Sequence, residues 1–141
     1  MKNTRHATTN YKALAPYIEG MDGRSSYRRF QSGGYMPLVF EFLHYNDYKG
    51  RPVFSITHYT TQNGDAMRDP EMTFSVDQDA GTIEPMTFQN DFMGMYQEVY
   101  RQNEAGTWFY SQRLRIDPDE FLWSWLKNIK EQGYRLEERE Q

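Results

Sequence analysis

The sequence contains no cysteine among its 141 residues. Disulfides, thiolate nucleophiles and zinc sites built from cysteine are therefore excluded, and a metal would have to bind to His, Asp and Glu side chains alone. The chain also lacks an apolar run long enough for a bilayer. The polar N-terminus carries Lys2 and Arg5 without the apolar segment of a signal peptide. We therefore expect a cytoplasmic protein that does not contact a membrane.

Neither sign of charge is in large excess, because the formal net charge of the chain is only -4. A mild and mixed charge argues against a nucleic-acid binder that neutralises many phosphates. The sequence contains no P-loop, dinucleotide fingerprint, nucleophile elbow or zinc-protease helix. These absences lower the expectation of an enzyme, and we expect no cofactor.

Aromatic residues, in contrast, are abundant. They make up 16% of the chain, with 11 Tyr and 9 Phe. A core of this size uses only part of so many rings, so some of them should lie on a surface that binds another molecule.

The length predicts a single domain over residues 1–141, with loose termini at 1–8 and 137–141. Apolar residues at helical spacing predict a first helix that ends near Gly20 and contains Pro16. They are Tyr11, Leu14, Ile18 and Met21. Residues 22–34 are rich in Gly and Ser and are interpreted as a loop.

Alternating apolar residues predict the strands. Residues 36–45 and 52–60 form a hairpin whose buried face holds Phe40, Phe42, Phe54 and Ile56 and continues to His58. A third strand covers 72–76, and a fourth covers 82–88, where Pro85 requires an edge or a bulge. Residues 92–100 fit a helix or a strand, and the turn and β-forming run that follow favour a strand.

The last helix has start and stop signals. Asp117 as N-cap, Pro118 at the first position and Glu120 form a capping box, and Gly133 ends the helix. Its buried stripe comprises Phe121, Leu122, Trp125, Leu126 and Ile129. The predicted class is therefore α+β, with an antiparallel sheet of about five or six strands packed against an N-terminal and a C-terminal helix.

Four residues form the densest group of His and carboxylates: His58, Asp65, Asp69 and Glu71. They could bind a divalent metal or act as an acid and base pair. A structural explanation accounts for more of the pattern, because Asn63-Gly64-Asp65 is typical of a tight turn and Asp69 before Pro70 of another. In this explanation His58 is a sheet residue whose ring is hydrogen-bonded.

The basic residues Arg24, Arg28 and Arg29 lie close to Tyr27. They could hold a phosphate or a stacked base, although a solvated loop is the simpler explanation. Trp123 lies off the buried stripe of the last helix, and it is expected to contact a partner chain or the N-terminal helix.

Three segments carry a family resemblance: 58–59 (His-Tyr), 62–65 (Gln-Asn-Gly-Asp) and 67–74 (Met-Arg-Asp-Pro-Glu-Met-Thr-Phe). Looser similarity covers 35–59, 89–94 and 121–128. With these segments the chain resembles a family of small bacterial proteins known only as a domain of unknown function. The resemblance implies proteins carried by plasmids and conjugative elements of gut Firmicutes, with a role in element maintenance, transfer or evasion of host defence. It supplies no catalytic residues.

Three functions follow from these patterns. The first is a non-enzymatic binding protein of a mobile genetic element that contacts another protein through the Tyr and Thr residues of the sheet face opposite the helices. The second is a metal-dependent hydrolase or nuclease that uses His58, Asp65, Asp69 and Glu71. The third is a single-stranded nucleic-acid binder that uses the Arg24, Arg28 and Arg29 group.

Overall fold

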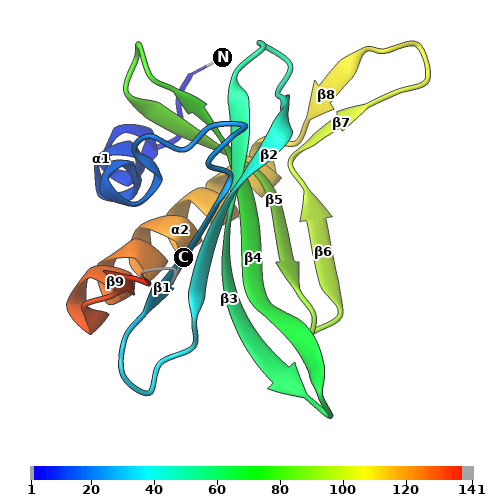
Figure 1. Ribbon diagram of the computed structural model, residues 1–141. Coiled ribbons are helices and arrows are strands. Elements are labelled where there is room, and N and C mark those ends of the chain that lie inside the picture. The colour runs from blue at the N-terminus through cyan, green and yellow to red at the C-terminus, as the bar shows by residue number, and fades with distance from the viewer. Residues whose placement is uncertain (1, 138–141) are drawn as a thin grey trace.

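The computed structural model describes residues 2–137 as two helices and an antiparallel sheet (Figure 1). The main sheet has seven strands in the order β6-β5-β4-β3-β2-β1-β9, and β7 and β8 form a separate hairpin. The α+β class is therefore confirmed, with more strands than the five or six expected. The helices are α1 (Ala7–Ile18) and α2 (Gln112–Gln132), and the strands are β1 (Tyr27–Gln31), β2 (Leu38–Asn46), β3 (Pro52–Gln62), β4 (Asp65–Asp77), β5 (Thr82–Asn90), β6 (Met95–Glu98), β7 (Tyr100–Gln102), β8 (Trp108–Tyr110) and β9 (Arg135–Leu136).

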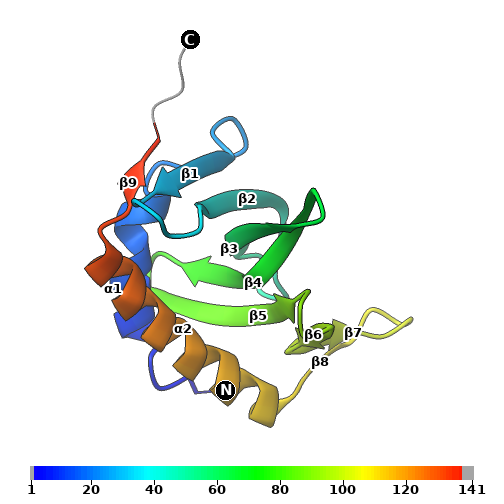
Figure 2. The ribbon, with the colours of Figure 1, turned by 90° about the horizontal axis from the view of Figure 1, so that it is seen from below.

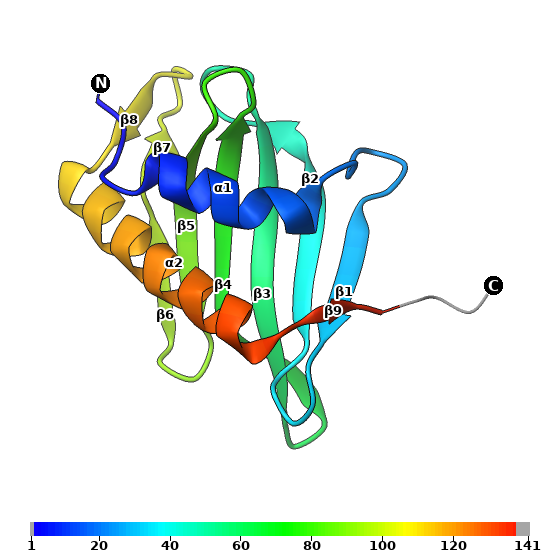
Figure 3. The same cartoon turned by 90° about the vertical axis from the view of Figure 1, so that its left-hand side faces the viewer.

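Both helices cover the same face of the sheet (Figure 3). Alternate residues of the strands point to this covered face, and the buried stripes of the two helices pack against them. Each fully buried Leu, Ile, Met or Phe side chain contributes about 1.5–3 kcal/mol relative to exposure. The largest of the completely buried side chains in this core are Phe40, Phe74, Leu14, Leu38, Ile56, Met72, Ile83, Leu122 and Ile129.

Short turns fix the pairing of the central strands. β3 and β4 are joined by Asn63 and Gly64, whose φ angles of 53° and 85° match a two-residue hairpin turn with positive φ at both positions. In the turn between β2 and β3, the Asp47 carboxylate accepts hydrogen bonds from the backbone N–H of Lys49 and Arg51, each at 2.9 Å. The hairpin expected from residues 36–45 and 52–60 is present as β2 and β3. The strand expected over 72–76 begins earlier, at Asp65, because residues 65–71 continue the pairing with β3.

Pro85 lies in β5 beside an irregularity in its pairing with β4. Thr73 pairs with Thr87 and Phe74 pairs with Pro85, so Met86 is the extra residue of a bulge. β6 pairs only with residues 87–90, which leaves the backbone of Pro85 without a neighbour on that side in the described sheet. The expected edge or bulge is therefore confirmed. Residues 95–98 and 100–102 are strands, which confirms the strand preferred for 92–100 except at 92–94, which form a turn.

The start of α2 differs from the prediction. Ser111, not Asp117, is the N-cap, and its side chain accepts a hydrogen bond from the backbone N–H of Leu114. Asp117 and Pro118 lie inside the helix, where Arg115 and Asp119 make long-range contacts that the local capping signal does not reveal. Gly133 ends the helix with a φ of 70°, as expected. Phe121 is 40% exposed and not buried, although its ring contacts Phe88 and Trp125.

The chain ends also differ from the prediction. α1 begins at Ala7, and His6 and Ala7 are buried, so residues 4–8 do not form a loose terminus. The predicted loop over 22–34 contains β1, and β1 pairs with β9 near the other end of the chain. The backbone N–H of Glu137 donates to the carbonyl of Arg29 at 2.8 Å. The rest of the predicted loose segment, 138–141, and Met1 lie outside the described residues.

Candidate functional site

The face of the sheet opposite the helices has no helix over it in residues 2–137 (Figure 2). The strand registers define its two central rows, because residues directly opposite each other on paired strands share a face. The first row is Tyr27, Glu41, Ser55, Thr73, Thr87 and Glu98. The second row is Arg29, Val39, Thr57, Glu71, Gln89 and Tyr96. We call these two rows, with Tyr45 and Tyr59, the uncovered face.

The middle of the uncovered face consists of small hydroxyl residues. Ser55, Thr57 and Thr73 are only 3%, 0% and 6% exposed. The Thr73 and Thr87 hydroxyls are 2.6 Å apart, and the Thr57 hydroxyl donates to a carboxylate oxygen of Glu71 at 3.3 Å.

Three tyrosines stand beside carboxylates on this face. The pKa values of Tyr45, Tyr59 and Tyr96 are raised, mainly by burial of their hydroxyls. Glu71 raises all three further by its negative charge, with Glu41 adding to the effect at Tyr59 and Glu98 at Tyr96. The rings and carboxylates therefore form one electrostatic group.

Glu71 is the half-buried carboxylate at the centre of this group. Burial raises its pKa above the usual 4.5, and the charges of Glu41 and Asp91 raise it further. Arg68 and the hydrogen bond from Thr57 act in the opposite direction. The protein therefore holds a carboxylate on this face in a place where its ionised form is disfavoured.

A cavity of about 750 Å³ opens at one side of the uncovered face. It lies between the chain around β1 and the start of β2 on one side and the hairpin of β3 and β4 on the other. Its aromatic lining comes from Tyr27, Tyr35 and Tyr59, and its carboxylate comes from Glu41. Met36 and Pro37 complete the apolar part.

The structure separates the four residues considered for a metal. His58 points to the covered face, where Trp125 donates its indole N–H to His58 Nδ1 at 3.2 Å and the Tyr134 hydroxyl lies 3.2 Å from Nε2. Glu71 lies on the uncovered face. Asp65 is exposed beside the hairpin turn, and Asp69 accepts a hydrogen bond from Asn90 at 3.0 Å. Across residues 2–137 no group of three or more His, Asp or Glu side chains is placed to hold a metal ion.

The structure corrects the role expected for Asp69. Residues 69 and 70 lie within β4, not in a turn, and the Asp69 side chain joins β4 to the end of β5. His58 has the hydrogen-bonded ring that the structural explanation expects, and burial lowers its pKa from 6.5 to about 4.

The three arginines considered for phosphate binding do not share one surface. Arg28 points to the covered side, where its guanidinium donates to the carbonyl of Tyr17 at 3.0 Å. Arg29 points to the uncovered face, and its Nε lies 3.2 Å from a carboxylate oxygen of Glu137. Arg24 is exposed in a turn held by the carboxylate of Asp22. Arg28 and Arg29 do line one cavity of about 410 Å³, but Glu137 supplies a negative charge there.

Trp123 contacts the chain just before α1, one of the two partners expected for it. Its ring stacks on the ring of His6, with centroids 4.6 Å apart. Lys127 Nζ also lies over the Trp123 ring, 3.5 Å from its centroid. The nearby Asp119 carboxylate accepts from the Thr4 hydroxyl at 2.7 Å and from the His6 backbone N–H at 3.0 Å. These contacts fasten the N-terminal segment to α2.

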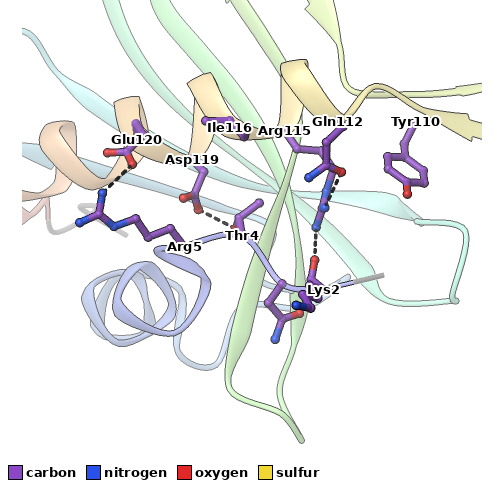
Figure 4. Close-up of a pocket in the computed structure, with 10 residues that line it drawn as sticks. Lys2, Thr4, Arg5, Tyr110, Gln112, Arg115, Ile116, Asp119 and Glu120 are labelled. Carbon is purple, nitrogen blue, oxygen red and sulfur yellow. Dashed lines mark hydrogen bonds and ion pairs between the residues drawn. The ribbon is translucent and has the colours of Figure 1, made fainter.

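A second cavity, of about 370 Å³, lies between this segment and the first turns of α2 (Figure 4). Its buried arginine, Arg115, binds the Glu84 carboxylate at 2.6 Å and the Lys2 carbonyl at 2.8 Å. Because Arg115 and Asp119 have partners within the protein, we interpret this cavity as part of the attachment of the N-terminal segment.

The sequence patterns did not identify Glu41, Glu98 or the cavity. The alternation that places Thr57 and Thr73 opposite the core also places these carboxylates there, so the signal was present in the strands. The cavity depends on segments that are distant in sequence, and its lining has no local motif.

Comparisons with known proteins give one finding. Searches of curated proteins and of solved structures found no match. Within residues 2–137, no helix has the length and apolar character needed to cross a membrane. The family model described as "Domain of unknown function (DUF6908)" matches residues 9–135. This range includes all of α2, most of α1 and strands β1 to β8, and it ends within β9. The chain therefore belongs to the DUF6908 family of domains of unknown function.

Proposed function

We propose that this domain is a non-enzymatic binding protein that contacts another protein through its uncovered face. The observation that supports this proposal is the group of tyrosines and carboxylates on a sheet face with no helix over it in residues 2–137. The family resemblance of the sequence supports a more specific role as a cytoplasmic accessory protein of plasmids or conjugative elements in gut Firmicutes.

The tyrosines on this face suit a binding surface. Tyr45 and Tyr96 are 51% and 56% exposed, and Tyr27 is 40% exposed. A tyrosine ring brings a large contact area with few rotatable bonds, so little conformational entropy is lost when a partner binds. The backbone beneath the rings lies in paired strands, so it does not have to be ordered when a partner binds.

The other two hypotheses have less support. A metal-dependent hydrolase needs converging ligands, whereas His58 and Glu71 lie on opposite faces of the sheet. A nucleic-acid binder needs clustered unpaired cations, whereas Arg28 and Arg29 point to opposite faces and contact a carbonyl and a carboxylate.

Quantitative capture from a lysate of the host cell tests the proposal. The bait proteins are the unchanged chain, a Tyr45→Ser and Tyr96→Ser double variant, and an Ile116→Ser control. Ile116 is 52% exposed on α2, which packs on the opposite face of the sheet, so the control removes an exposed apolar side chain far from the uncovered face.

We expect one or more proteins to be recovered with the unchanged chain and the control and to be depleted with the double variant. Equal recovery with all three folded baits would refute a role for the uncovered face. Circular dichroism of each bait establishes that the comparison is made between folded proteins.

A further inference from the structure

The uncovered face carries negative charge that the protein does not neutralise. Glu41, Glu71 and Glu98 take part in no ion pair within residues 2–137. Two of the nearby cations are already bound to other carboxylates, whereas Arg101 lines a cavity together with Glu98. Arg29 pairs with Glu137, and Arg68 Nε lies 3.1 Å from a carboxylate oxygen of Asp91. The charge left on this face is therefore negative and is complementary to a cationic partner.

The aromatic rings favour the same class of partner. A guanidinium or ammonium group is attracted to the face of a tyrosine ring, by about 0.5–1 kcal/mol when exposed and about 2 kcal/mol when desolvated. The 750 Å³ cavity offers the rings of Tyr27, Tyr35 and Tyr59 together with the Glu41 carboxylate. Its size falls within the usual range of about 300–1,000 Å³ for pockets that enclose a small ligand or a side chain.

The centre of the face has a further reason to attract a cation. Glu71 is half-buried and lies near the charge of Glu41, and both conditions disfavour its ionised form. A bound cation would relieve this repulsion and would compensate for part of the desolvation. Arg68 and the Thr57 hydroxyl already favour the ionised form of Glu71 in part, and a bound positive group would favour it further.

We propose that the partner presents a basic segment to the uncovered face, with an arginine or lysine side chain in the cavity beside Tyr27, Tyr59 and Glu41 and further basic residues along Glu71 and Glu98. This inference rests on the proposed function, and it specifies the chemistry of the partner. Carboxylates on three of the five neighbouring strands from β2 to β6 suit an extended segment with several cations.

Fluorescence anisotropy with a labelled octa-arginine peptide tests this inference on the full chain. A labelled octa-glutamate peptide and a labelled single-stranded oligonucleotide serve as the comparison probes. The test variant is Glu41→Gln with Glu71→Gln, and the control is Glu104→Gln with Glu131→Gln. The control makes the same charge change at exposed positions outside the uncovered face.

We expect the octa-arginine peptide to bind the unchanged chain and the control, with an affinity that falls as salt is added. The Glu41→Gln and Glu71→Gln variant should bind it about tenfold more weakly or worse. Backbone amide shifts in an NMR titration should map to β2, β3 and β4 near Glu41, Tyr59 and Glu71.

Three results would overturn the inference: no binding of octa-arginine, an equal loss in both double variants, or tighter binding of the oligonucleotide than of the peptide. Its failure is distinguishable from that of the proposed function. If the capture experiment still shows a partner that depends on Tyr45 and Tyr96 while octa-arginine does not bind, the face binds a partner of different chemistry. If capture is independent of the face, the proposed function itself fails.

Discussion

Trp125 donates its indole N–H to Nδ1 of His58 at 3.2 Å, across 67 residues of sequence. Both side chains are buried, so the hydrogen bond joins α2 to the covered face of β3. We predict that Trp125→Phe lowers the free energy of unfolding by about 1–3 kcal/mol, because the His58 nitrogen loses its donor and the smaller ring packs less well. Urea denaturation measures the change. Trp123→Phe, on the partly exposed side of the same helix, should lower the free energy of unfolding by less. An equal loss in the two variants would contradict a stabilising role of the hydrogen bond between Trp125 and His58.

The buried His58 ring predicts a pH dependence of stability. Burial lowers its pKa from 6.5 to about 4 because the charged imidazolium is disfavoured, although Asp69 opposes the shift. Below pH 6.5 the unfolded chain takes up a proton that the folded chain does not bind until about pH 4. This contribution to stability is therefore complete above pH 6.5 and is lost between pH 6.5 and 4, by at most about 1.4 kcal/mol per pH unit.

Denaturation of the unchanged chain and of His58→Gln at several pH values tests this dependence. Glutamine retains an acceptor for Trp125 but does not titrate. The difference in stability between the two proteins should change between pH 6.5 and 4 and stay constant above pH 7. A difference that is constant throughout would show that His58 does not titrate as the structure predicts.

Glu71 predicts the opposite pH dependence. Its pKa is raised in the folded protein, so the folded state binds a proton more readily than the unfolded state and loses stability as the pH rises through that pKa. Glu71→Gln should therefore stabilise the protein at pH 7 and have less effect at pH 4. Thr57 can still donate to the glutamine oxygen. Thermal unfolding at the two pH values measures the change, and a destabilised variant at pH 7 would contradict the prediction.

The pair of Arg115 and Glu84 predicts a large effect of single substitutions. Arg115 is 2% and Glu84 6% exposed, with Nε and Oε1 2.6 Å apart, and the Tyr100 hydroxyl also donates to Glu84. Removing one partner leaves a buried charge, so Glu84→Leu or Arg115→Met should cost about 3–5 kcal/mol. The double variant should recover part of this loss. A double-mutant cycle by urea denaturation measures the coupling, and additive losses would show that the two residues act independently.

The hydrogen bonds of Asp119 predict that the N-terminal segment contributes to the stability of the fold. The Asp119 carboxylate accepts two hydrogen bonds from that segment, so Asp119→Ala, which removes both acceptors, should destabilise the protein by about 1–3 kcal/mol. The matched control is Asp117→Ala. Asp117 is exposed within α2, and its substitution should change stability by less than about 0.5 kcal/mol. Hydrogen exchange should become faster at the amides of α1 in the first variant only.

Much of the fold was predictable because it depends on local chemistry. The alternation of Phe40, Phe54 and Ile56 reports a strand with one buried face, and Asn63-Gly64 reports the turn that pairs two strands. β1 was missed because Phe30 is its only buried apolar residue, which gives no alternation to recognise. The start of α2 was misplaced because Asp117 followed by Pro118 is typical of a helix start. The contacts that Arg115 and Asp119 make inside the helix reach residues distant in sequence, so no local pattern indicates them.

The candidate site was only partly predictable for the same reason. A Tyr-rich and Thr-rich face opposite the helices follows from alternation along single strands. Glu41, Glu71 and Glu98 share one face only because of the register between neighbouring strands. The cavity forms only because the chain before β2 lies near the β3 and β4 hairpin. Pairing between strands is set by the whole sheet, so these features appear only when the sheet is assembled.

The turn of two residues between β3 and β4 has a consequence for how this family can vary in length. Glu71 on the uncovered face and Met72 in the core are neighbours in sequence, so from Glu71 onward the odd and even positions of β4 have different roles. A bulge between Arg68 and Glu71 already shifts the pairing of β4 with β3 once on the side of the turn. Adding one residue between the turn and Glu71 would exchange these roles, and would bring a carboxylate into the core and a methionine to the surface. Insertions and deletions in this hairpin should therefore occur in steps of two residues, or be absorbed by a new bulge.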